Sequence, residues 1–391
     1  AGDAMNVALR VDPQERADRE AGWVGEARCP PISFAVVGAL WDWNSREVHA
    51  NGIGASEETI VYLAKGLAAE RHPVTVYGPV PEPEVHHGVT YLPRARQRFC
   101  KEGKVVVSRS PNHAATLDEL TGWSLPKILW LQDAHYAELN SENAAHYETI
   151  VVVSEWHKQA MHELHGVPLA KMVVIPNFVL AEHFSGANAE GVIRKKDHFI
   201  YASSPDRGVN RLLELWPAIR ERLPEATLDI FYGWRGCERL GLGAGGARWT
   251  QRYEAARRKY EQLRHQPGVR AHGMVNHETI ARAFMGSGVW AYPSGDRENG
   301  PFAETCCTNA IKARAAGCVP VCPPTAALAE TAATEYGVPF ADALDGDGAA
   351  FVNACVAATD VGDGDRARMS AEALDLYELA RVLPKWREIL R

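Results

Sequence analysis

Residues 201–234 have the sequence YASSPDRGVNRLLELWPAIRERLPEATLDIFYGW, in which apolar runs enclose a loop and an amphipathic stretch. The amphipathic stretch has helical spacing, because Leu212, Leu215, Trp216 and Ile219 fall on one face. The predicted order is therefore strand, loop, helix, strand. This order is the unit from which parallel sheets with crossover helices are built.

The same alternation extends along the chain in both directions. Continuous apolar runs, typical of strands buried on both faces, occur at 32–38, 74–78, 104–108, 127–131, 149–154 and 171–177, and again at 198–203, 227–233, 288–294 and 318–322. The two series predict an α/β protein with two doubly wound, Rossmann-like domains. Ligands bind outside the carboxyl ends of such strands, so we expect the site in the central cleft that the two domains face.

The length of 391 residues exceeds what one hydrophobic core usually serves, which also favours two domains. The segment between the two strand series carries Gly, Ala and charge and is expected to link them. We expect the following division: a lead-in at 1–31, an N-terminal domain at 32–179, a linker at 180–197, a C-terminal domain at 198–372 and a last helix at 373–391.

Charge and composition exclude several classes of protein. A net charge of -7 gives no general attraction to nucleic acid, so any phosphate must be held by local groups. The eight cysteines show no pair of CxxC units, and small buried thiols are expected rather than a metal or redox site. Because no apolar run reaches the about 20 residues that span a bilayer, we expect a cytoplasmic protein.

Two loops have features that suit a phosphate. Gly54 precedes an amphipathic helix within 51–70, and the first amides of that helix could donate hydrogen bonds to an anion. The negative charges of Glu57 and Glu58 in the same turn would repel an anion. Arg207 follows the strand at 198–203, where a guanidinium can clamp a diphosphate bidentately. The alternative for Arg207 is an ordinary surface arginine.

Several segments, taken in order, resemble the retaining glycosyltransferases of family four, which have the GT-B architecture. The similar segments are GIGASEETIVYLAKGLA after the first strand, VVVSEWHKQAMHELHGVPLAKMVVIPNFV at 151–179, SSPDRGVNRLLELWP around Arg207, HGMVNHETIARAFMGSGVWAYPS at 272–294 and FAETCCTNAIKARAAGCVPV at 302–321. Each segment alone is a weak signal, whereas their order along the chain from about 32 to 385 predicts the fold.

The resemblance implies a reaction as well as a fold. Such enzymes transfer a hexose-type sugar from a UDP- or GDP-linked donor to a hydroxyl of a glycan or another acceptor, with retention of configuration and without a metal or other cofactor. The first domain would bind the acceptor and the second the nucleotide sugar. The last helix would cross back to the first domain, as in that family.

The resemblance also assigns residues to the donor side. Arg207 and the amides that open a helix near Thr305 and Cys306 would receive the charge that develops on the departing diphosphate. Glu304 matches an acid of the family's motif that contacts the donor sugar. Further donor-side candidates are Ser204, Gly54, Arg235 and Asn299.

Residues 127–136, KILWLQDAHY, depart from the family pattern. The family commonly has a histidine just before the aspartate at the end of this strand, whereas here Gln132 precedes Asp133 and a histidine, His135, follows two residues later. Glutamine can bond a sugar hydroxyl but cannot exchange a proton near neutral pH. We expect Gln132, Asp133 and His135 to act with Glu304 in catalysis; for His135 the alternative is a turn-capping role.

Lys312 is a second departure, because the family has a glutamate at this position that accepts hydrogen bonds from the ribose. An ammonium group only donates. Three explanations remain open: a solvated lysine on the helix face, a lysine that pairs with a phosphate or an acidic neighbour, and loss of donor binding.

Two other functions and one other partner remain open. A GT-B nucleotide-sugar epimerase would share the fold but would need a stronger acid and base than Gln132 and Glu304. A non-catalytic protein that binds a nucleotide sugar or a glycan would account for Gln132 and Lys312 together. The basic run RARQRFCKEGK at 94–104 could meet an anionic acceptor or a membrane surface peripherally, although a solvated loop is the simpler interpretation.

If position 312 faces the ribose, Lys312→Glu restores a hydrogen-bond acceptor there and tightens nucleotide-sugar binding at least several-fold. Isothermal titration calorimetry with UDP- and GDP-sugars measures the change. Unchanged or weaker binding would reject a ribose-facing position.

Overall fold

The computed structural model describes residues 10–11, 29–37, 45–46, 50, 52–99, 102–121, 124–234, 246–298 and 300–391. The chain divides into two compact units, which we describe separately. Unit 1 comprises Ala1–Glu47, Ile53–Ile175 and Leu383–Arg391, and unit 2 comprises Val48–Gly52 and Pro176–Val382.

Unit 1 contains a nine-stranded sheet in the order β1-β4-β5-β3-β2-β6-β7-β8-β9. All neighbouring strands are parallel except β4 and β5, which form an antiparallel pair. The strands are β1 (Arg10–Val11), β2 (Ile32–Val36), β3 (Val74–Gly78), β4 (Glu84–His86), β5 (Val89–Pro93), β6 (Lys104–Ser108), β7 (Lys127–Trp130), β8 (Thr149–Val152) and β9 (Met172–Val174).

The helices of unit 1 pack on its sheet. They are α3 (Ala55–Ala69), α4 (His113–Thr121), α5 (Ser141–Ala145), α6 (Glu155–His165) and the end of α16 (Leu379–Leu390), with 3₁₀ turns η1 (Arg94–Phe99) and η2 (Leu169–Lys171). The last helix is held by an edge-to-face contact between Trp386 and Trp130, with ring centroids 4.7 Å apart. Lys104 donates a hydrogen bond of 3.0 Å to the carbonyl of Ile389. The chain end therefore belongs to unit 1 although it follows unit 2 in sequence.

Unit 2 contains a five-stranded sheet in the order β12-β11-β10-β13-β16, and all of its neighbouring strands are parallel. The strands are β10 (Lys195–Ala202), β11 (Thr227–Phe231), β12 (Val269–Gly273), β13 (Ser287–Ala291) and β16 (Val319–Val321). Strand β13, which lies between β10 and β16, is buried along its whole length, because helices cover both faces of a parallel sheet. A short antiparallel hairpin is formed by β14 (Gly295–Asp296) and β15 (Gly300–Pro301).

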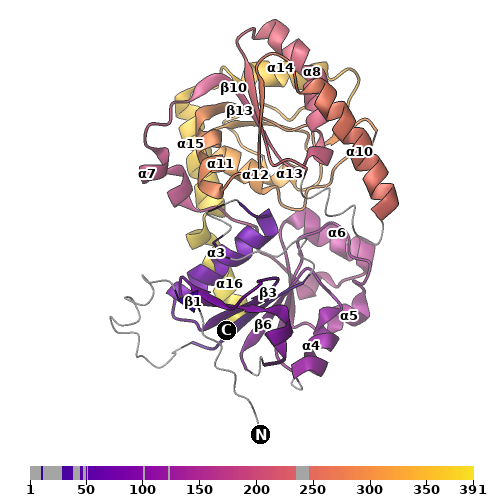
Figure 1. Ribbon diagram of the computed structural model, residues 1–391, viewed down its shortest axis with the longest axis vertical. Helices are drawn as coiled ribbons and strands as arrows, with labels where there is room; N and C mark the ends of the chain where they lie inside the picture. The colour runs from indigo at the N-terminus through magenta and orange to yellow at the C-terminus, as the bar shows by residue number, and fades with distance from the viewer. Residues whose placement is uncertain are drawn as a thin grey trace. The chain divides into compact units, whose positions relative to one another are not determined.

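Two groups of helices enclose the unit 2 sheet. In Figure 1, α8 (Val209–Arg222), α10 (Gly246–Leu263) and α14 (Ala349–Ala358) lie on one side of β10 and β13, and α11 (His277–Gly286), α12 (Thr308–Ala315) and α15 (Asp363–Tyr377) lie on the other. The remaining helical elements are η3 (Ala181–Phe184), α7 (Gly186–Ala189), η4 (Pro205–Arg207) and α13 (Leu328–Thr331). The core of the unit is rich in aromatic rings, including Trp216 and Trp290.

Both sheets reverse their strand order at one point. In unit 1 the chain passes from β2 to β3 on one side and later to β6 on the other, and in unit 2 it passes from β10 to β11 and later to β13. Such a topological switch point is where doubly wound sheets bind ligands, beyond the carboxyl ends of the two diverging strands. The residues that follow β6, β10 and β13 therefore lie where a ligand would bind.

The two doubly wound sheets that the apolar runs predicted are both present. The strands that the sequence did not indicate are the polar edge strand β12 and the short β1, β4, β5, β14 and β15. Residues 180–197, expected as a linker, contain η3, α7 and the start of β10 and are part of unit 2. This segment packs on its own unit, since η3 contacts α11.

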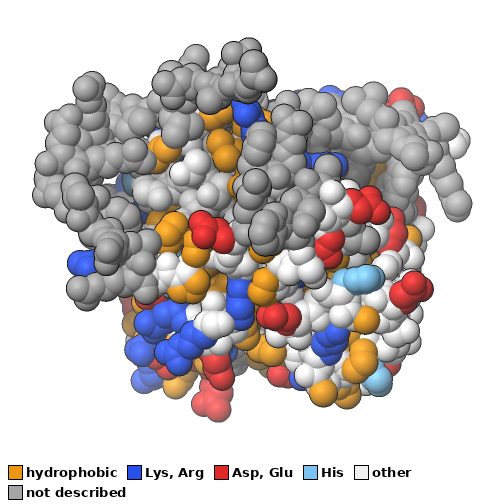
Figure 2. Space-filling view, turned by 90° about the horizontal axis from the view of Figure 1, so that it is seen from below, with side chains coloured by type: hydrophobic (Ala, Val, Ile, Leu, Met, Phe, Trp, Pro, Cys, Tyr) orange, Lys and Arg blue, Asp and Glu red, His pale blue; other side chains and the backbone are white. Residues whose placement is uncertain are grey.

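The surface carries mixed charge. On the face that Figure 2 presents, acidic, basic and hydrophobic side chains are interspersed, with a small group of Lys and Arg at one edge. In the basic run at 94–104, Arg94 is exposed and Gln97 is buried. Among the described residues, none of the helices combines the length and the apolar character needed to cross a membrane.

Arg366 ties three parts of unit 2 together. From α15 its guanidinium donates hydrogen bonds to the carbonyls of Gly288 at 2.6 Å, Gly317 at 3.1 Å and Ala358 at 2.9 Å. Its Nε also donates to Val361 at 2.9 Å. Since Arg366 is buried, these carbonyls depend on it for their partners.

Arg366→Ala should therefore destabilise unit 2 by about 3–5 kcal/mol, because it leaves several buried acceptors unsatisfied. Arg368→Ala, which removes an exposed arginine of the same helix, is the matched control and should leave the stability almost unchanged. Urea unfolding followed by circular dichroism measures both. Equal losses in the two variants would show that the buried arginine has no special structural role.

Candidate functional site

The switch point of unit 2 brings Arg207 and Glu304 together. Arg207 ends η4, the turn that directly follows β10, and Tyr292 directly follows β13, the neighbouring strand. Glu304 comes after the β14–β15 hairpin. The Nη1 atom of Arg207 lies 3.3 Å from Oε1 of Glu304, so the predicted juxtaposition of this arginine and this acid is present.

Glu304 is held by a buried tyrosine. The hydroxyl of Tyr292 donates a hydrogen bond of 2.6 Å to the same Oε1 atom that Arg207 contacts. Burial raises the pKa of Tyr292 well above its usual value, and the charge of Glu304 adds to this effect. Tyr292 therefore stays protonated and uncharged. Its hydroxyl orients the Glu304 carboxylate by a hydrogen bond and adds no negative charge beside it.

Arg207 is only partly engaged by the protein. Burial lowers its pKa, but the charge of Glu304 outweighs this effect, so the net pKa lies above the usual value. Its guanidinium carbon lies 4.2 Å from the ring centroid of Phe302, which supports the plane of the group. Among the described residues the guanidinium makes one hydrogen bond, to Glu304, and it is 35% exposed. Most of its five donors therefore remain for an anionic ligand.

Two glycines allow the Arg207 turn to reach the strand beside it. Gly208 has φ of 114° and Gly295 has φ of 137°, both in the region that favours glycine. A Cβ atom on Gly208 would lie 2.5 Å from the carbonyl oxygen of Gly295. The close backbone contact fixes the turn against the β14–β15 hairpin.

Ser204, predicted on the donor side, helps to build this turn. Its carbonyl accepts hydrogen bonds from the hydroxyl of Tyr201 at 2.8 Å and from the amide of Arg207 at 3.0 Å. Its hydroxyl donates to Asp206. These contacts give Ser204 a structural task, and a contact with ligand stays a prediction.

The helix expected to open near Thr305 and Cys306 begins later. Both residues lie in a bend, and α12 starts at Thr308 after an extended Cys307. The reason is tertiary: the carbonyl of Glu304 accepts a hydrogen bond of 3.0 Å from the amide of Ala327, which holds this segment out of a helix. Burial raises the pKa of Cys306 to about 12, so its thiol stays protonated at neutral pH.

Lys312 is not the solvated lysine that one explanation required. It is 5% exposed, and its Nζ lies 3.1 Å from Nδ1 of His277, the first residue of α11. A buried ammonium group needs acceptors, and the imidazole nitrogen supplies one. The explanations that involve an altered nucleotide site or lost donor binding stay open.

In unit 1 the switch point carries a charged cluster. Arg109, directly after β6, donates two hydrogen bonds of 2.8 Å to the carboxylate of Asp133, one from Nε and one from Nη2. Its Nη1 lies 3.6 Å from Oε1 of Glu57, which is in the first turn of α3. A bidentate arginine fixes the orientation of Asp133.

The backbone around Asp133 is also held. The hydroxyl of Tyr136 accepts hydrogen bonds from the amides of Gln132 at 2.7 Å and Asp133 at 2.8 Å. Nε2 of His157 lies 3.0 Å from the carbonyl of Asp133, while Nδ1 accepts from the amide of Val153 at 3.3 Å. This pattern requires a neutral imidazole with its proton on Nε2.

The other sequence candidates of unit 1 have simpler surroundings. His135 is exposed and stacks on His165 of α6, with ring centroids 5.1 Å apart. Gly54 is the N-cap of α3, and a Cβ atom there would lie 2.4 Å from the carboxylate of Glu57. The negative charge of that carboxylate beside the helix start opposes an anion at Gly54, as the sequence suggested.

Two further donor-side candidates, Arg235 and Asn299, lie outside the described residues.

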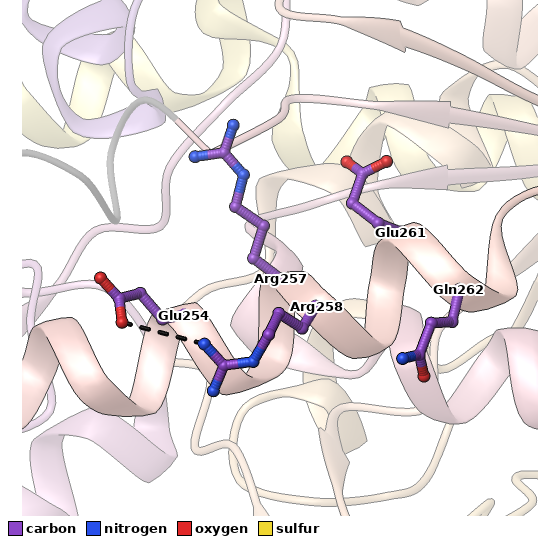
Figure 3. A pocket seen from close by; sticks show the side chains of 5 residues that line it. All are labelled: Glu254, Arg257, Arg258, Glu261 and Gln262. Atoms are coloured by element: carbon purple, nitrogen blue, oxygen red, sulfur yellow. Dashed lines mark ion pairs between the residues drawn. The ribbon is translucent and has the colours of Figure 1, made fainter.

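A shallow hollow of about 350 Å³ runs along the outer surface of α10 (Figure 3). It is lined by Glu254, Arg257, Arg258, Glu261 and Gln262, all from one helix. Figure 3 shows these side chains spread along the helix, with an exposed pair between Glu254 and Arg258 at 3.9 Å. None of the candidate site residues lines this hollow, and it has the features of a solvated helix face.

Sequence reasoning missed Tyr292, Phe302 and Arg109. Arg109 stands next after the apolar run 104–108, and Tyr292 lies toward the carboxyl end of the run 288–294, so position alone could have indicated both. Phe302 had no such signal. Its contact with Arg207 depends on the antiparallel pairing of β14 with β15, which precede it.

No protein-family model and no curated protein matches this chain. Solved structures do match in fold. Sucrose-phosphate synthase from Thermosynechococcus elongatus has a TM-score of 0.62 at 14% identity, covering 92% of this chain and 98% of its own. AviGT4, a glycosyltransferase involved in avilamycin A biosynthesis, has a TM-score of 0.62 at 15% identity, covering 93% and 97%.

HepE of Anabaena, solved in complex with UDP-glucose, has a TM-score of 0.64 at 13% identity, covering 92% of this chain and 99% of its own. These structural neighbours are GT-B glycosyltransferases. At such low identity the likeness establishes the fold. The chain therefore has the GT-B type of α/β fold with two Rossmann-like domains.

The buried His157 predicts a pH dependence of stability. Burial lowers its pKa from 6.5 to about 4, so the unfolded chain binds a proton in this range that the folded chain does not. Unit 1 should lose stability as the pH falls from about 6.5 to about 4, by roughly 3 kcal/mol.

Urea unfolding at several pH values measures this loss. His157→Gln should flatten the dependence, while the matched control His146→Gln, at an exposed position, should preserve it. The same slope in wild type and in His157→Gln would contradict the prediction.

Proposed function

We propose that this protein is a glycosyltransferase that transfers a hexose-type sugar from a nucleotide-diphosphate sugar, UDP- or GDP-linked, to a hydroxyl of a glycan or another acceptor. The observation that carries the proposal is the contact between Arg207 and Glu304 at the switch point of unit 2. It supports the proposal because the guanidinium of Arg207 can donate hydrogen bonds to a phosphate, while the carboxylate of Glu304 beside it can accept hydrogen bonds from sugar hydroxyls.

Arg207 would stabilise the departing group. Breaking the bond between the anomeric carbon and the diphosphate oxygen leaves negative charge on that oxygen, which a preorganised guanidinium neutralises. Arg207 suits this role because Phe302 supports its plane and most of its donors remain available among the described contacts. The acceptor oxygen would bond to the anomeric carbon, and its proton would pass to the departing diphosphate.

Glu304 would orient the sugar. Its carboxylate shares one oxygen between Tyr292 and Arg207, which leaves Oε2 to accept from sugar hydroxyls. The side chain is 9% exposed, so a hydrogen bond there would be stronger than in water. The charge of the carboxylate would also favour positive charge that develops on the sugar ring.

The finer parts of the proposal rest on the sequence resemblance. These parts are retention of configuration, the absence of a metal requirement, and roles for Gln132, Asp133 and His135 in catalysis. Of these three residues, Asp133 has the most firmly oriented side chain, since Arg109 donates two hydrogen bonds to its carboxylate. Locked in this way, Asp133 suits a hydrogen-bond acceptor for a hydroxyl better than a mobile proton carrier.

A protein that binds nucleotide sugars without transferring them is the rival function. The buried contact between Lys312 and His277 favours it, because a donor-only side chain stands where the similar family binds ribose with a carboxylate. The two functions differ in turnover, not in binding.

A panel of UDP- and GDP-sugars, tested first for thermal shift and then for hydrolysis and transfer, separates these functions. A transferase should show a shift with one donor and slow release of free sugar from the same donor. Arg207→Ala should reduce that release by roughly 100-fold, the typical effect of losing one stabilising donor.

Arg222→Ala is the matched control, because it removes an exposed arginine from the far end of the adjacent helix α8. It should leave both binding and turnover unchanged. A shift without hydrolysis or transfer by the wild type would favour the binding protein. No shift with any donor would reject both functions.

A further inference from the structure

The charged cluster at the unit 1 switch point consists of Arg109, Asp133 and Glu57. Arg109 donates two hydrogen bonds of 2.8 Å to Asp133, and its Nη1 lies 3.6 Å from Oε1 of Glu57. One positive and two negative charges leave these three side chains with a net charge of -1. The cluster lies beyond the carboxyl ends of β6 and β7, where a doubly wound sheet receives its ligand.

Glu57 fills the place that an anion would take at the start of α3. A helix N-terminus attracts anions, because its first amides have no partners within the helix and its dipole is positive there. The carboxylate of Glu57 folds back over the N-cap residue Gly54, since a Cβ atom on Gly54 would lie 2.4 Å from Oε2 of Glu57. The chain thus supplies this negative charge itself, and a second anion there would be repelled.

The carboxylate of Asp133 is the part of the cluster that a ligand reaches most easily. Its side chain is 41% exposed, compared with 25% for Arg109 and 14% for Glu57. Arg109 donates one hydrogen bond to each carboxylate oxygen, and an ionised carboxylate has about four acceptor positions. The remaining positions suit hydroxyl or ammonium donors, and they repel a phosphate or another carboxylate.

The histidine that supports Asp133 does not offset this negative charge. Nε2 of His157 lies 3.0 Å from the carbonyl oxygen of Asp133, and burial lowers the pKa of His157 to about 4. The imidazole is therefore neutral at pH 7. The positive charge that faces the two carboxylates comes from Arg109, which both of them share.

We propose that the unit 1 switch point binds a sugar acceptor without an anionic group through the carboxylate of Asp133, and that Glu57 excludes acceptors that carry a phosphate or a carboxylate there. This inference rests on the proposed function and deepens it, because it names the charge class of the acceptor. Glu57 is then a specificity-determining residue. The inference disfavours the anionic acceptor that the basic run at 94–104 left open.

Transfer assays with matched acceptors test the charge preference. Glucose, galactose and mannose are each offered unmodified, as the amino sugar, as the uronic acid and as the 6-phosphate, with the donor that the wild type hydrolyses. At least one unmodified or amino sugar should accelerate nucleotide release, and kcat/KM should be lower by about tenfold for the anionic forms of the same hexose. Equal or faster release with the anionic forms would overturn the proposal, as would the failure of every unmodified and amino sugar.

Variants of Glu57 separate charge exclusion from a role in folding. Glu57→Gln removes the charge at nearly constant size, so kcat/KM for the anionic acceptors should rise about tenfold while that for the uncharged ones stays nearly unchanged. Glu57→Asp keeps the charge and should keep the wild-type preference. Glu142→Gln, which neutralises an exposed glutamate in the first turn of α5, is the matched control and should also keep it. A lower Tm in Glu57→Gln with an unchanged preference would show that the ion pair serves only the fold, and would overturn the proposal.

The results also distinguish this inference from the function on which it rests. If the wild type neither binds nor hydrolyses any UDP- or GDP-sugar, the proposed function fails and this inference fails with it. If donor hydrolysis depends on Arg207 but anionic and uncharged acceptors react equally well, only the role of Glu57 fails.

Discussion

The carboxylate of Glu304 is largely withdrawn from water, and this constraint organises unit 2 around its switch point. A buried carboxylate needs charge and hydrogen-bond partners, because the loss of hydration costs several kcal/mol. Tyr292 and Arg207 supply these partners from the ends of two adjacent strands. Their positions require the close contact of Gly208 with Gly295 and the bend that delays α12 to Thr308. One buried acid thus explains the conformation of several loops.

Left-handed residues mark the same end of the sheets. Arg109 follows β6 directly, Tyr232 follows β11 directly, and Ser294 lies shortly after β13. Each lies where a parallel strand ends and a loop begins. A positive φ costs conformational free energy for a residue other than glycine. The cost is understandable where the side chain has a task, such as the clamp of Arg109 on Asp133. Strain and charge therefore coincide at both switch points.

Sequence patterns located the buried strands and failed at the polar or short ones. The runs at 74–78 and 104–108 match β3 and β6 residue for residue, since burial on both faces demands continuous apolar sequence. The edge strand β12 contains Arg270 and His272, so no apolar run announces it. The helix expected to open at Thr305 fails for another reason. Its start depends on the hydrogen bond from Ala327 to Glu304, which joins residues far apart in sequence.

The sequence by itself determined the α/β class, the two strand series and the loop in which Arg207 stands, because these follow from local periodicity and burial. Tertiary structure decided which side chains meet. The contact of Arg207 with Glu304 spans 97 residues, and that of Lys312 with His277 spans 35. Pairing over such separations is set by strand order and by loops that cross the sheet end. Local periodicity carries no information about it: the meeting of Arg207 and Glu304 was expected only from the family resemblance, and the contact of Lys312 with His277 and the burial of these charges appeared only in the folded chain.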